Sequence, residues 1–496
     1  MTTQIEHWIN GARVAGTSGR HAAVFNPATG KQTAEVSLAS AAEVDLAVAA
    51  AKEAAAGWRA TSLSRRAEVL FAFRQLLHEH SDALAQVVTA EHGKVVPDAA
   101  GEIARGLENV EYATGVPNLL KGGYSEQAST GVDVYSVRQP LGVVAGITPF
   151  NFPVMVPLWM CANAIATGNA FVLKPSEKDP SAALFLAELW KRAGLPDGVF
   201  TVVQGDKESV DALLRHPDVA AVSFVGSTPV ARHIYETGTA QGKRVQALGG
   251  AKNHMVVLPD ADIDLAADAA VSAGYGAAGE RCMAVSFVFA VGEVGDRLVD
   301  AIALRLPKLV IGDGAAPGTD MGPLISGEHR DRVAGYITAG ETSGATLVVD
   351  GREADVPSDG FFLGTTLLDH VEEDMSVYTD EIFGPVLSVV RAATYDDALA
   401  LINSNQYANG AAIFTRDGGA ARRFQLDVEV GMVGINVPIP VPVAYYSFGG
   451  WRSSLFGDSH MYGPEGINFY TRGKVVTSRW PDPATSAVDL GFPQTR

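Results

Sequence analysis

Apolar residues recur at helical spacing through the first quarter of the chain. Over residues 41–115, apolar side chains stand three and four positions apart, which predicts a run of amphipathic helices. From residue 141 onward, short apolar runs alternate with further helical segments; the runs are LGVVAGI, AFVLKP, FTVVQG and AVSFVG, separated by PVMVPLWMCANAIA, SAALFLAELWKRAG and SVDALLRHP. This alternation predicts a parallel, doubly wound α/β sheet.

A second α/β series begins near residue 250, with the strand-like runs HMVVLP, SFVFAV, TLVVDG, PVLSVV, AAIFT and GMVGIN. We therefore expect two α/β domains, the first from residues 1–120 and 140–249 with a return segment at about 445–466, and the second from residues 250–444. Residues 121–139 and 467–496 alternate apolar and polar positions outside both series. We expect them to form exposed strands of a small oligomerisation element.

Residues 141–173 carry no charged side chain, which is also typical of a membrane-spanning helix. Pro149, Pro153 and Pro157 interrupt this segment, and so do three asparagines. We therefore expect a buried strand, a loop and a buried helix here, and no membrane span.

Charge and cysteine content exclude several classes of protein. The 496-residue chain has 38 basic and 56 acidic residues and a formal charge of −18, so it offers no electrostatic footprint for nucleic acid or an anionic membrane. Its two cysteines and 11 histidines form neither a disulfide framework nor a metal-binding array. The N-terminus has no apolar signal segment, and we expect a cytoplasmic protein without a metal site.

Cys282 is the strongest candidate for chemistry. It lies in GYGAAGERCMA, where glycines permit a close backbone approach and Arg281 places a positive charge beside the thiol. A lone cysteine is more often a buried core residue. Because a neighbouring cation lowers a thiol pKa, we interpret Cys282 as a nucleophile and Cys161, in an apolar helical segment, as a core residue.

Two segments indicate a nucleotide site, although no GxGxxG motif follows the first strand. Gly226 and Ser227 follow a strand, and Pro229 marks a helix start that can receive a phosphate. The alternative is a simple capped helix. Lys174 and Glu177 stand at the carboxyl end of another strand, where they could hold ribose hydroxyls or form an exposed ion pair.

Several motifs occur in the order and approximate spacing of one enzyme family; they are ITPFNFP, KPSE, FVGST, LGGAKN, GERC, EIFGP and GINVP. On these motifs the chain resembles the aldehyde dehydrogenase superfamily nearly from end to end. ARGLENVEYA, QALGGAKNH and GERCMA resemble its CoA-acylating branch, the methylmalonate-semialdehyde (malonate-semialdehyde) dehydrogenases. The resemblance implies an aldehyde dehydrogenase-like α/β fold, with a Rossmann-type NAD-binding first domain, a catalytic second domain and a small β oligomerisation element.

The resemblance also implies roles for single residues. A Cys282 thiolate would attack the aldehyde carbon and form a thiohemiacetal, whose oxyanion Asn151 and the backbone N–H of Cys282 would stabilise. Taken alone, Asn151 would be a loop-capping residue. Glu381 would hold the nicotinamide ribose, with Phe383 beside the ring. The remaining cofactor-binding positions are Thr148, Phe150, Lys174, Glu177, Lys178, Gly226, Ser227 and Gly249.

Two positions of the sequence predict the cofactor and the acyl acceptor. The Glu177 carboxylate repels a 2′-phosphate, which favours NAD, although the adjacent Lys178 is a cation that could tolerate phosphate. Hydrolytic relatives use a glutamate as general base where this chain has Ala247 in ALGGAKN. A thiol needs less activation than water, so coenzyme A is the predicted acceptor. Gly249 and Gly250 would still let the cofactor approach closely.

The resemblance further implies that Arg105 and Arg281 hold the carboxylate of a semialdehyde, whose oxidation with loss of CO₂ gives acetyl-CoA or propionyl-CoA. For Arg105 the alternative is a surface ion pair with Glu102 or Glu108, three positions away on one helix. Two other functions stay open: a hydrolytic semialdehyde dehydrogenase that releases a free acid, and a non-catalytic metabolite-binding relative. We also expect a homodimer or homotetramer.

Overall fold

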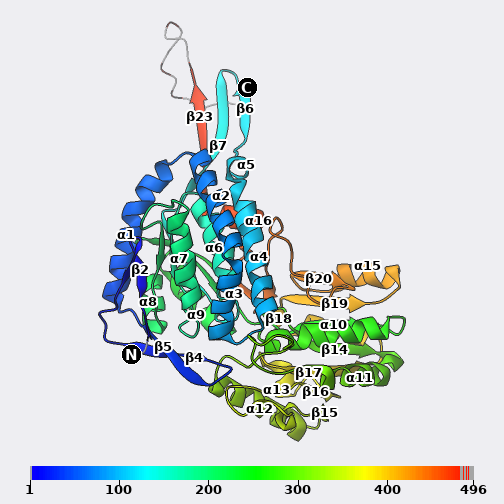
Figure 1. Cartoon of the computed structure of the whole chain (residues 1–496). Coiled ribbons are helices and arrows are strands. Elements are labelled where there is room, and N and C mark those ends of the chain that lie inside the picture. Colours follow the sequence, from blue (N-terminus) through cyan, green and yellow to red (C-terminus); the bar gives the residue numbers. More distant parts are fainter. Residues whose placement is uncertain (1–2, 481–483, 485–487, 489, 491–496) are drawn as a thin grey trace.

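The computed structural model describes residues 3–480, 484, 488 and 490. Two α/β lobes lie against one another, and a narrow β projection extends from the first lobe (Figure 1). The predicted α/β fold class is confirmed. Within the described residues, no helix is both long and apolar enough to cross a membrane.

The first lobe is built on an eight-stranded sheet in the order β22-β12-β11-β8-β9-β10-β2-β3. The five strands from β12 to β10 are parallel, and their runs of buried apolar residues match a sheet covered on both faces. The strands are β2 (His7–Ile9), β3 (Ala12–Val14), β8 (Val143–Ile147), β9 (Ala170–Lys174), β10 (Phe200–Val202), β11 (Val219–Val225), β12 (Arg244–Leu248) and β22 (Leu455–Phe456).

Nine helices of the described residues belong to this lobe, and the predicted helical run over residues 41–115 is confirmed. The first begins with a capping box, in which the Ser40 and Glu43 side chains bond each other's backbone N–H. The uncharged segment forms strand β8, a loop and the fully buried helix α6, as predicted. The helices are α1 (Ala41–Ala60), α2 (Leu63–Glu79), α3 (Ser81–His92), α4 (Val96–Thr114), α5 (Val116–Leu119), α6 (Met155–Ala166), α7 (Ser181–Arg192), α8 (Lys207–Arg215) and α9 (Thr228–Ala240).

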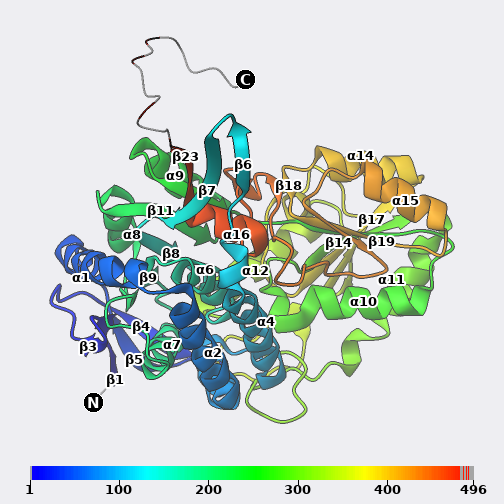
Figure 2. The ribbon, with the colours of Figure 1, turned by 90° about the horizontal axis from the view of Figure 1, so that it is seen from above.

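The second lobe contains a seven-stranded sheet in the order β15-β16-β17-β14-β13-β19-β20, parallel except for β15. Its strands are β13 (Asn253–Val257), β14 (Val285–Val291), β15 (Thr346–Val349), β16 (Thr366–Asp369), β17 (Val386–Ala392), β19 (Gly410–Phe414) and β20 (Met432–Ile435). Its helices are α10 (Ile263–Tyr275), α11 (Gly295–Ala303), α12 (Gly327–Thr342), α13 (Ser376–Thr379), α14 (Tyr395–Ser404) and α15 (Gly418–Asp427), with 3₁₀ turns at Gly276–Gly279, Gly292–Val294, Leu306–Lys308 and Gly351–Glu353. Seen from above, the two lobes lie side by side (Figure 2).

The projection is an antiparallel sheet of β6 (Tyr124–Ser129), β7 (Val132–Pro140) and β23 (Thr471–Arg479). The predicted strand character of residues 121–139 is therefore confirmed. The tail differs at its start, because residues 467–469 complete helix α16 (Gly463–Phe469) before β23 begins. Residues 481–483, 485–487, 489 and 491–496 of the predicted oligomerisation segment lie outside the described residues.

Two small sheets were not predicted. One contains β1 (Thr3–Ile5), β4 (His21–Asn26) and β5 (Lys31–Ser37), and the other β18 (Tyr407–Ala408) and β21 (Trp451–Arg452). These strands are short or largely exposed, so they lack the apolar runs by which the larger strands are recognised. The domain boundaries proposed from the sequence stay predictions.

Candidate active site

The carboxyl ends of β8, β9 and β11 open into a cavity of about 970 Å³ between the lobes, which we call the groove. In the sheet register Ile147 pairs with both Lys174 and Phe224, so the loops after these strands start at one level. Strand order reverses between β8 and β11, where open α/β sheets bind ligands. The predicted site residues that line the groove are Thr148, Phe150, Asn151, Lys174, Glu177, Lys178, Gly226, Ser227, Gly249, Cys282, Glu381 and Phe383.

Cys282 is carried by a strained loop between α10 and β14. Ala277, Ala278 and Gly279 all have left-handed backbone conformations, with φ of 51°, 53° and 74°. Alanine pays a steric penalty there, which the surrounding packing must offset. A Cβ on Gly279 would lie 2.1 Å from the carbonyl oxygen of Gly384, so this position requires glycine. The loop holds the thiol of the second lobe toward the first lobe across the groove.

The Cys282 thiol is protonated at neutral pH in this arrangement, contrary to the sequence prediction. Burial raises its pKa to about 12, and the Glu381 carboxylate adds to the rise. Arg281 lowers the pKa only slightly, because its guanidinium donates to Asp98 of α4 at 2.6 Å. The prediction of an acidic thiol was wrong because adjacency in sequence shows the cation and hides both the burial and the opposing carboxylate.

We expect alkylation of Cys282 by iodoacetamide, without added nucleotide, to be slow at pH 7 and to be still accelerating at pH 10, because the thiolate is the reactive form. Glu381→Gln removes the charge that raises the thiol pKa, so it should speed labelling several-fold at pH 8. Mass spectrometry of the labelled peptide measures the rate, with buried Cys161 as the internal control. A pH midpoint of the labelling rate below 8, or slower labelling of Glu381→Gln, would contradict the conclusion that burial and Glu381 raise the pKa of Cys282.

Asn151 ties the loop after β8 to the thiol loop. The residue is 3% exposed, and its side-chain Nδ2 donates to the backbone carbonyl of Glu280 at 3.0 Å. The bond reaches across the groove to a residue two positions before Cys282, so Asn151 does not merely cap its own loop. The fold therefore brings the predicted nucleophile and the predicted oxyanion donor to one place.

A buried ion pair, which the sequence analysis missed, supports Asn151. Lys94 Nζ lies 2.7 Å from the Glu102 carboxylate and also donates to the backbone carbonyl of Asn151 at 2.5 Å. Glu102 accepts in turn from the N–H groups of Val154 and Met155 at the start of α6. Such a pair is stabilised by this full set of hydrogen bonds, and it holds the β8 loop in position.

Glu280, also missed, lies beneath the thiol loop between two histidines. Its carboxylate accepts from the N–H of Ile325 at 3.2 Å and stands 3.5 Å from His329 Nε2 and 3.9 Å from His92 Nε2. Burial raises the pKa of Glu280 to about 8 and lowers that of His329 to about 4, so both are largely uncharged at pH 7. Its place two residues before Cys282 was the available sequence signal.

Glu381 forms the second-lobe side of the groove. It accepts from the N–H of Ala251 at 2.9 Å, and burial raises its pKa to about 7. A Cβ on Gly250 would lie 2.4 Å from Glu381 Oε2, and one on Gly249 2.6 Å from the Ser453 carbonyl oxygen. These glycines thus make room for groups of the protein itself, and the close approach of a cofactor to them stays a prediction.

Phe150 and Phe383 pack edge to face at 5.8 Å, one from each lobe. Lys178 Nζ lies 5.1 Å from the centre of the Phe150 ring. This side chain therefore turns toward the aromatic pair. The expectation that Lys178 could accept a nucleotide phosphate is not supported by this placement.

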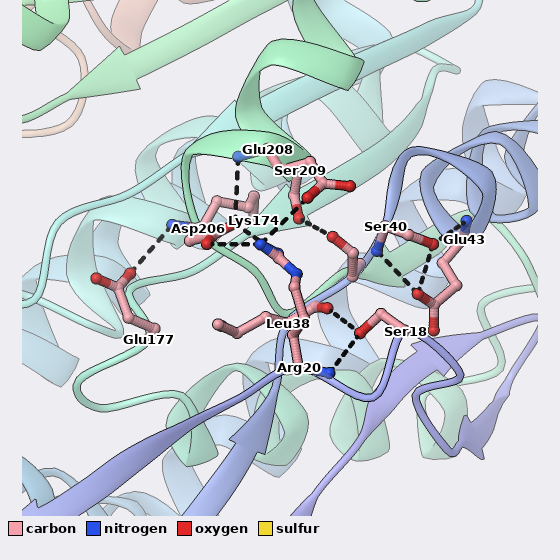
Figure 3. Close-up of polar contacts among 11 residues, drawn as sticks. Ser18, Arg20, Leu38, Ser40, Glu43, Lys174, Glu177, Asp206, Glu208 and Ser209 are labelled. Atoms are coloured by element: carbon pink, nitrogen blue, oxygen red, sulfur yellow. Dashed lines mark hydrogen bonds and ion pairs between the residues drawn. The ribbon is translucent and has the colours of Figure 1, made fainter.

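Lys174 and Glu177 form an ion pair of 3.4 Å at the carboxyl end of β9 (Figure 3), as in the alternative interpretation, except that Lys174 is buried; their binding of ribose hydroxyls stays a prediction. Helix α9 starts beside them, after Gly226 and Ser227. Ser227 occupies the N-cap position as predicted, but its side chain makes no capping bond. Thr228 Oγ1 instead accepts from the N–H of Gly250 at 2.8 Å.

Arg105 does not line the groove; its contacts show the ion pair of the alternative interpretation, and its binding of a substrate carboxylate stays a prediction. It pairs with Glu108 at 2.7 Å, whereas Glu102 is bonded to Lys94 instead. The second arm of its guanidinium donates to the carbonyl of Pro442 at 2.7 Å, in the loop before α16. Asp98, Glu102 and Arg105 lie four and three positions apart and so share one face of α4. This spacing could have indicated that the three side chains face the same neighbouring region.

The groove offers the partners that a dinucleotide requires. Two carboxylates, Glu177 and Glu381, stand on the first-lobe and second-lobe sides and can accept from ribose hydroxyls. The start of α9 lies on its wall and can receive a diphosphate. Apolar side chains, among them Val210, Phe224 and Val230, can cover a base. The residues present therefore fit NAD.

Comparison with known sequences finds similar proteins along nearly the whole chain. The aldehyde dehydrogenase family model matches residues 14–476. A malonate-semialdehyde dehydrogenase of Pseudomonas aeruginosa is 54% identical over 493 residues, which cover 99% of this chain and 99% of the relative. A malonate-semialdehyde dehydrogenase of Geobacillus kaustophilus is 50% identical over 484 residues, covering 97% and 100%.

Solved structures of similar proteins superpose along nearly the whole chain. A protein of Sinorhizobium meliloti 1021 in complex with NAD, assigned as a methylmalonate-semialdehyde dehydrogenase, gives a TM-score of 0.97 at 53% identity, over 98% of this chain and 100% of the other. The methylmalonate-semialdehyde dehydrogenase of Oceanimonas doudoroffii gives 0.96 at 55% identity, over 98% and 99%.

Proposed function

The chain belongs to the aldehyde dehydrogenase family, and from that premise we propose that it oxidises malonate or methylmalonate semialdehyde with NAD and transfers the acyl group to coenzyme A. One observation carries the proposal: Cys282, Asn151 and Glu381 face one groove, while the position of the hydrolytic base holds Ala247. The names of the similar proteins support the substrate class.

Cys282 is the proposed nucleophile. After the thiol loses its proton to solvent, the Cys282 thiolate attacks the aldehyde carbon, and the former carbonyl oxygen of the thiohemiacetal takes up the negative charge. Asn151 Nδ2 and the backbone N–H of Cys282 would donate to that oxygen; losing one such donor typically costs about 10²–10³ in rate.

Glu177 and Lys174 would hold the adenosine ribose, the start of α9 the diphosphate, and Glu381 with Phe150 and Phe383 the nicotinamide end. NAD, when bound, supplies a hydride acceptor. The product left on the protein is a thioester of Cys282.

Coenzyme A is the proposed acceptor of this acyl group. Ala247 has no group that could accept a proton from a water molecule. It is completely buried in β12, within the core that contains Val222 and Val245. A thiol ionises closer to neutral pH than water does, and therefore needs no base of that strength. Loss of CO₂ from the substrate, which yields acetyl-CoA or propionyl-CoA, is part of the proposal.

Rapid mixing of enzyme, NAD and malonate semialdehyde without CoA should give a burst of NADH near one per active site, followed by slow turnover. CoA should restore steady turnover and yield an acyl-CoA product, measured by absorbance at 340 nm and by mass spectrometry. Equal steady rates with and without CoA would instead identify the hydrolytic enzyme. Absence of any NADH with aldehydes would favour the non-catalytic, metabolite-binding alternative.

The proposal extends to assembly and location. The β6-β7-β23 projection exposes Tyr124 and Val475 by 65% and 69%, which is typical of a surface that pairs with another copy. We propose a homodimer or homotetramer, in the cytoplasm, and size-exclusion chromatography with light scattering tests the first point.

A further inference from the structure

A second acidic position lies next to Glu177 at the adenosine end of the groove. Asp206 follows β10, the neighbour of β9 in the sheet, and it lines the groove together with Lys174 and Glu177. It also lines a surface cleft of about 750 Å³ on its other side, which holds Arg20. Asp206 therefore separates an arginine from the part of the groove proposed for the ribose (Figure 3).

Arg20 is held by two carboxylates. Its two terminal nitrogens donate to the two Asp206 oxygens at 2.9 and 3.0 Å, and Glu208 lies 3.1 Å from one of them. A bidentate pair of this kind fixes the plane of the guanidinium as well as its position. Asp206 also caps α8, where its side chain accepts from the N–H of Glu208 at 3.1 Å.

The backbone of Arg20 is fixed too. Its N–H donates to Ser18 Oγ at 3.1 Å, and Ser18 Oγ donates to the Leu38 carbonyl at 2.6 Å (Figure 3). The N–H of Thr17 donates to Glu43 of α1 at 2.6 Å. The base of the side chain is thus rigid, and only the Asp206 and Glu208 pairs decide where the guanidinium points.

The other cations of the groove have partners as well. Lys174 pairs with Glu177 and Lys207 with Asp211, Lys178 lies over Phe150, and Arg332 donates to His329 Nδ1 at 3.1 Å. We propose that Asp206 is a second specificity-determining residue for the cofactor, because it withholds Arg20 from the ribose 2′ position beside Glu177. This excludes the 2′-phosphate of NADP by denying it an arginine.

The inference rests on the proposed NAD site, and nucleotide fragments test the two separately. Isothermal titration calorimetry compares ADP with 2′-phospho-ADP, which differ only in the 2′-phosphate, and needs no aldehyde or turnover. The wild-type protein should bind ADP and strongly disfavour 2′-phospho-ADP. Asp206→Ser, whose hydroxyl still caps α8, should reduce this discrimination about tenfold or more.

A second substitution shows whether the effect of Asp206→Ser comes from the release of Arg20 or only from the loss of the Asp206 charge. Asp206→Ser/Arg20→Ala should regain most of the wild-type discrimination, while Asp206→Glu, which keeps both charge and partner, should leave it unchanged. Unaltered discrimination in Asp206→Ser, or a gain that survives removal of Arg20, overturns the inference. A wild-type protein that binds neither fragment overturns the NAD site itself, whereas retained ADP binding shows that each variant is folded.

Discussion

Cys282→Ala should abolish aldehyde oxidation while NAD still binds. Removing a covalent nucleophile usually costs several orders of magnitude in rate, so we expect less than about one per cent of wild-type NADH formation. Nucleotide binding should persist, because the proposed contacts to NAD come from Glu177, Glu381 and the start of α9. Stopped-flow absorbance at 340 nm measures the loss, and calorimetry with NAD measures the retained binding.

Cys161→Ala is the matched control. Cys161 is completely buried in α6, and burial raises the pKa of its thiol, so it behaves as a small apolar residue. Its replacement should lower stability slightly and leave turnover intact. Substantial activity in Cys282→Ala would show that another group attacks the aldehyde, and an inactive but folded Cys161→Ala would show that the core assignment is wrong.

The resemblance implies that Arg105 holds the substrate carboxylate, although Arg105 lies outside the groove; on that hypothesis Arg105→Ala should lower kcat/KM for malonate semialdehyde far more than for propanal, which lacks the carboxylate. Truncating one side of a desolvated charge pair costs roughly 2–5 kcal/mol, about 30- to 5000-fold in kcat/KM. Arg105→Lys should recover only part of this, because an ammonium cannot reproduce a bidentate fork. Steady-state kinetics with both aldehydes and saturating CoA give the two ratios.

Arg74→Ala serves as the control, because Arg74 of α2 forms a similarly exposed ion pair with Glu111 of α4. It should leave both substrates unaffected. The Tyr462 hydroxyl still donates to the Pro442 carbonyl at 3.1 Å when Arg105 is removed, so that loop keeps one of its two anchors. Equal losses with both aldehydes would return Arg105 to the role of a loop anchor and surface ion-pair partner.

Arg281→Ala distinguishes a substrate contact from thiol tuning. Arg281 lowers the thiol pKa slightly, so its removal should move the pH midpoint of the NADH burst upward and slow propanal as well. The Asp98 carboxylate would lose its partner at the same time. No such pH shift is expected for Arg105→Ala, because Arg105 donates to Glu108 and Pro442.

Much of the fold was predictable because its signals are local. The buried strands of the two large sheets are continuous apolar runs, as in Val143–Ile147 and Val285–Val291, and such runs need no distant partner to be recognised. The helix start at Ser227 was also predicted, from residues within a few positions of one another. By contrast, β16 and the strands of the N-terminal sheet were not foreseen, because they are short or largely exposed and form no long apolar run.

The candidate site was likewise predicted from the sequence only in part. The motifs identified the family and the residues that line the groove, and both the family and the fold class are confirmed. The sequence could not reveal that Glu102 turns inward to Lys94 while Arg105 reaches Pro442, because partners on different elements are chosen by packing. Glu280 and its histidines escaped notice for the same reason.

By itself, the sequence determined which chemical groups are present: one candidate thiol beside a glycine-rich turn, an alanine in place of a base, and carboxylates at the ends of strands. Only the tertiary structure decided their charge states and directions. Burial and Glu381 raise the pKa of Cys282, although the nearest residue in sequence is an arginine, and Asp206 holds Arg20 in a bidentate ion pair. The physical reason is that covalent neighbours are set along the chain, whereas desolvation and Coulomb energies depend on distances through space.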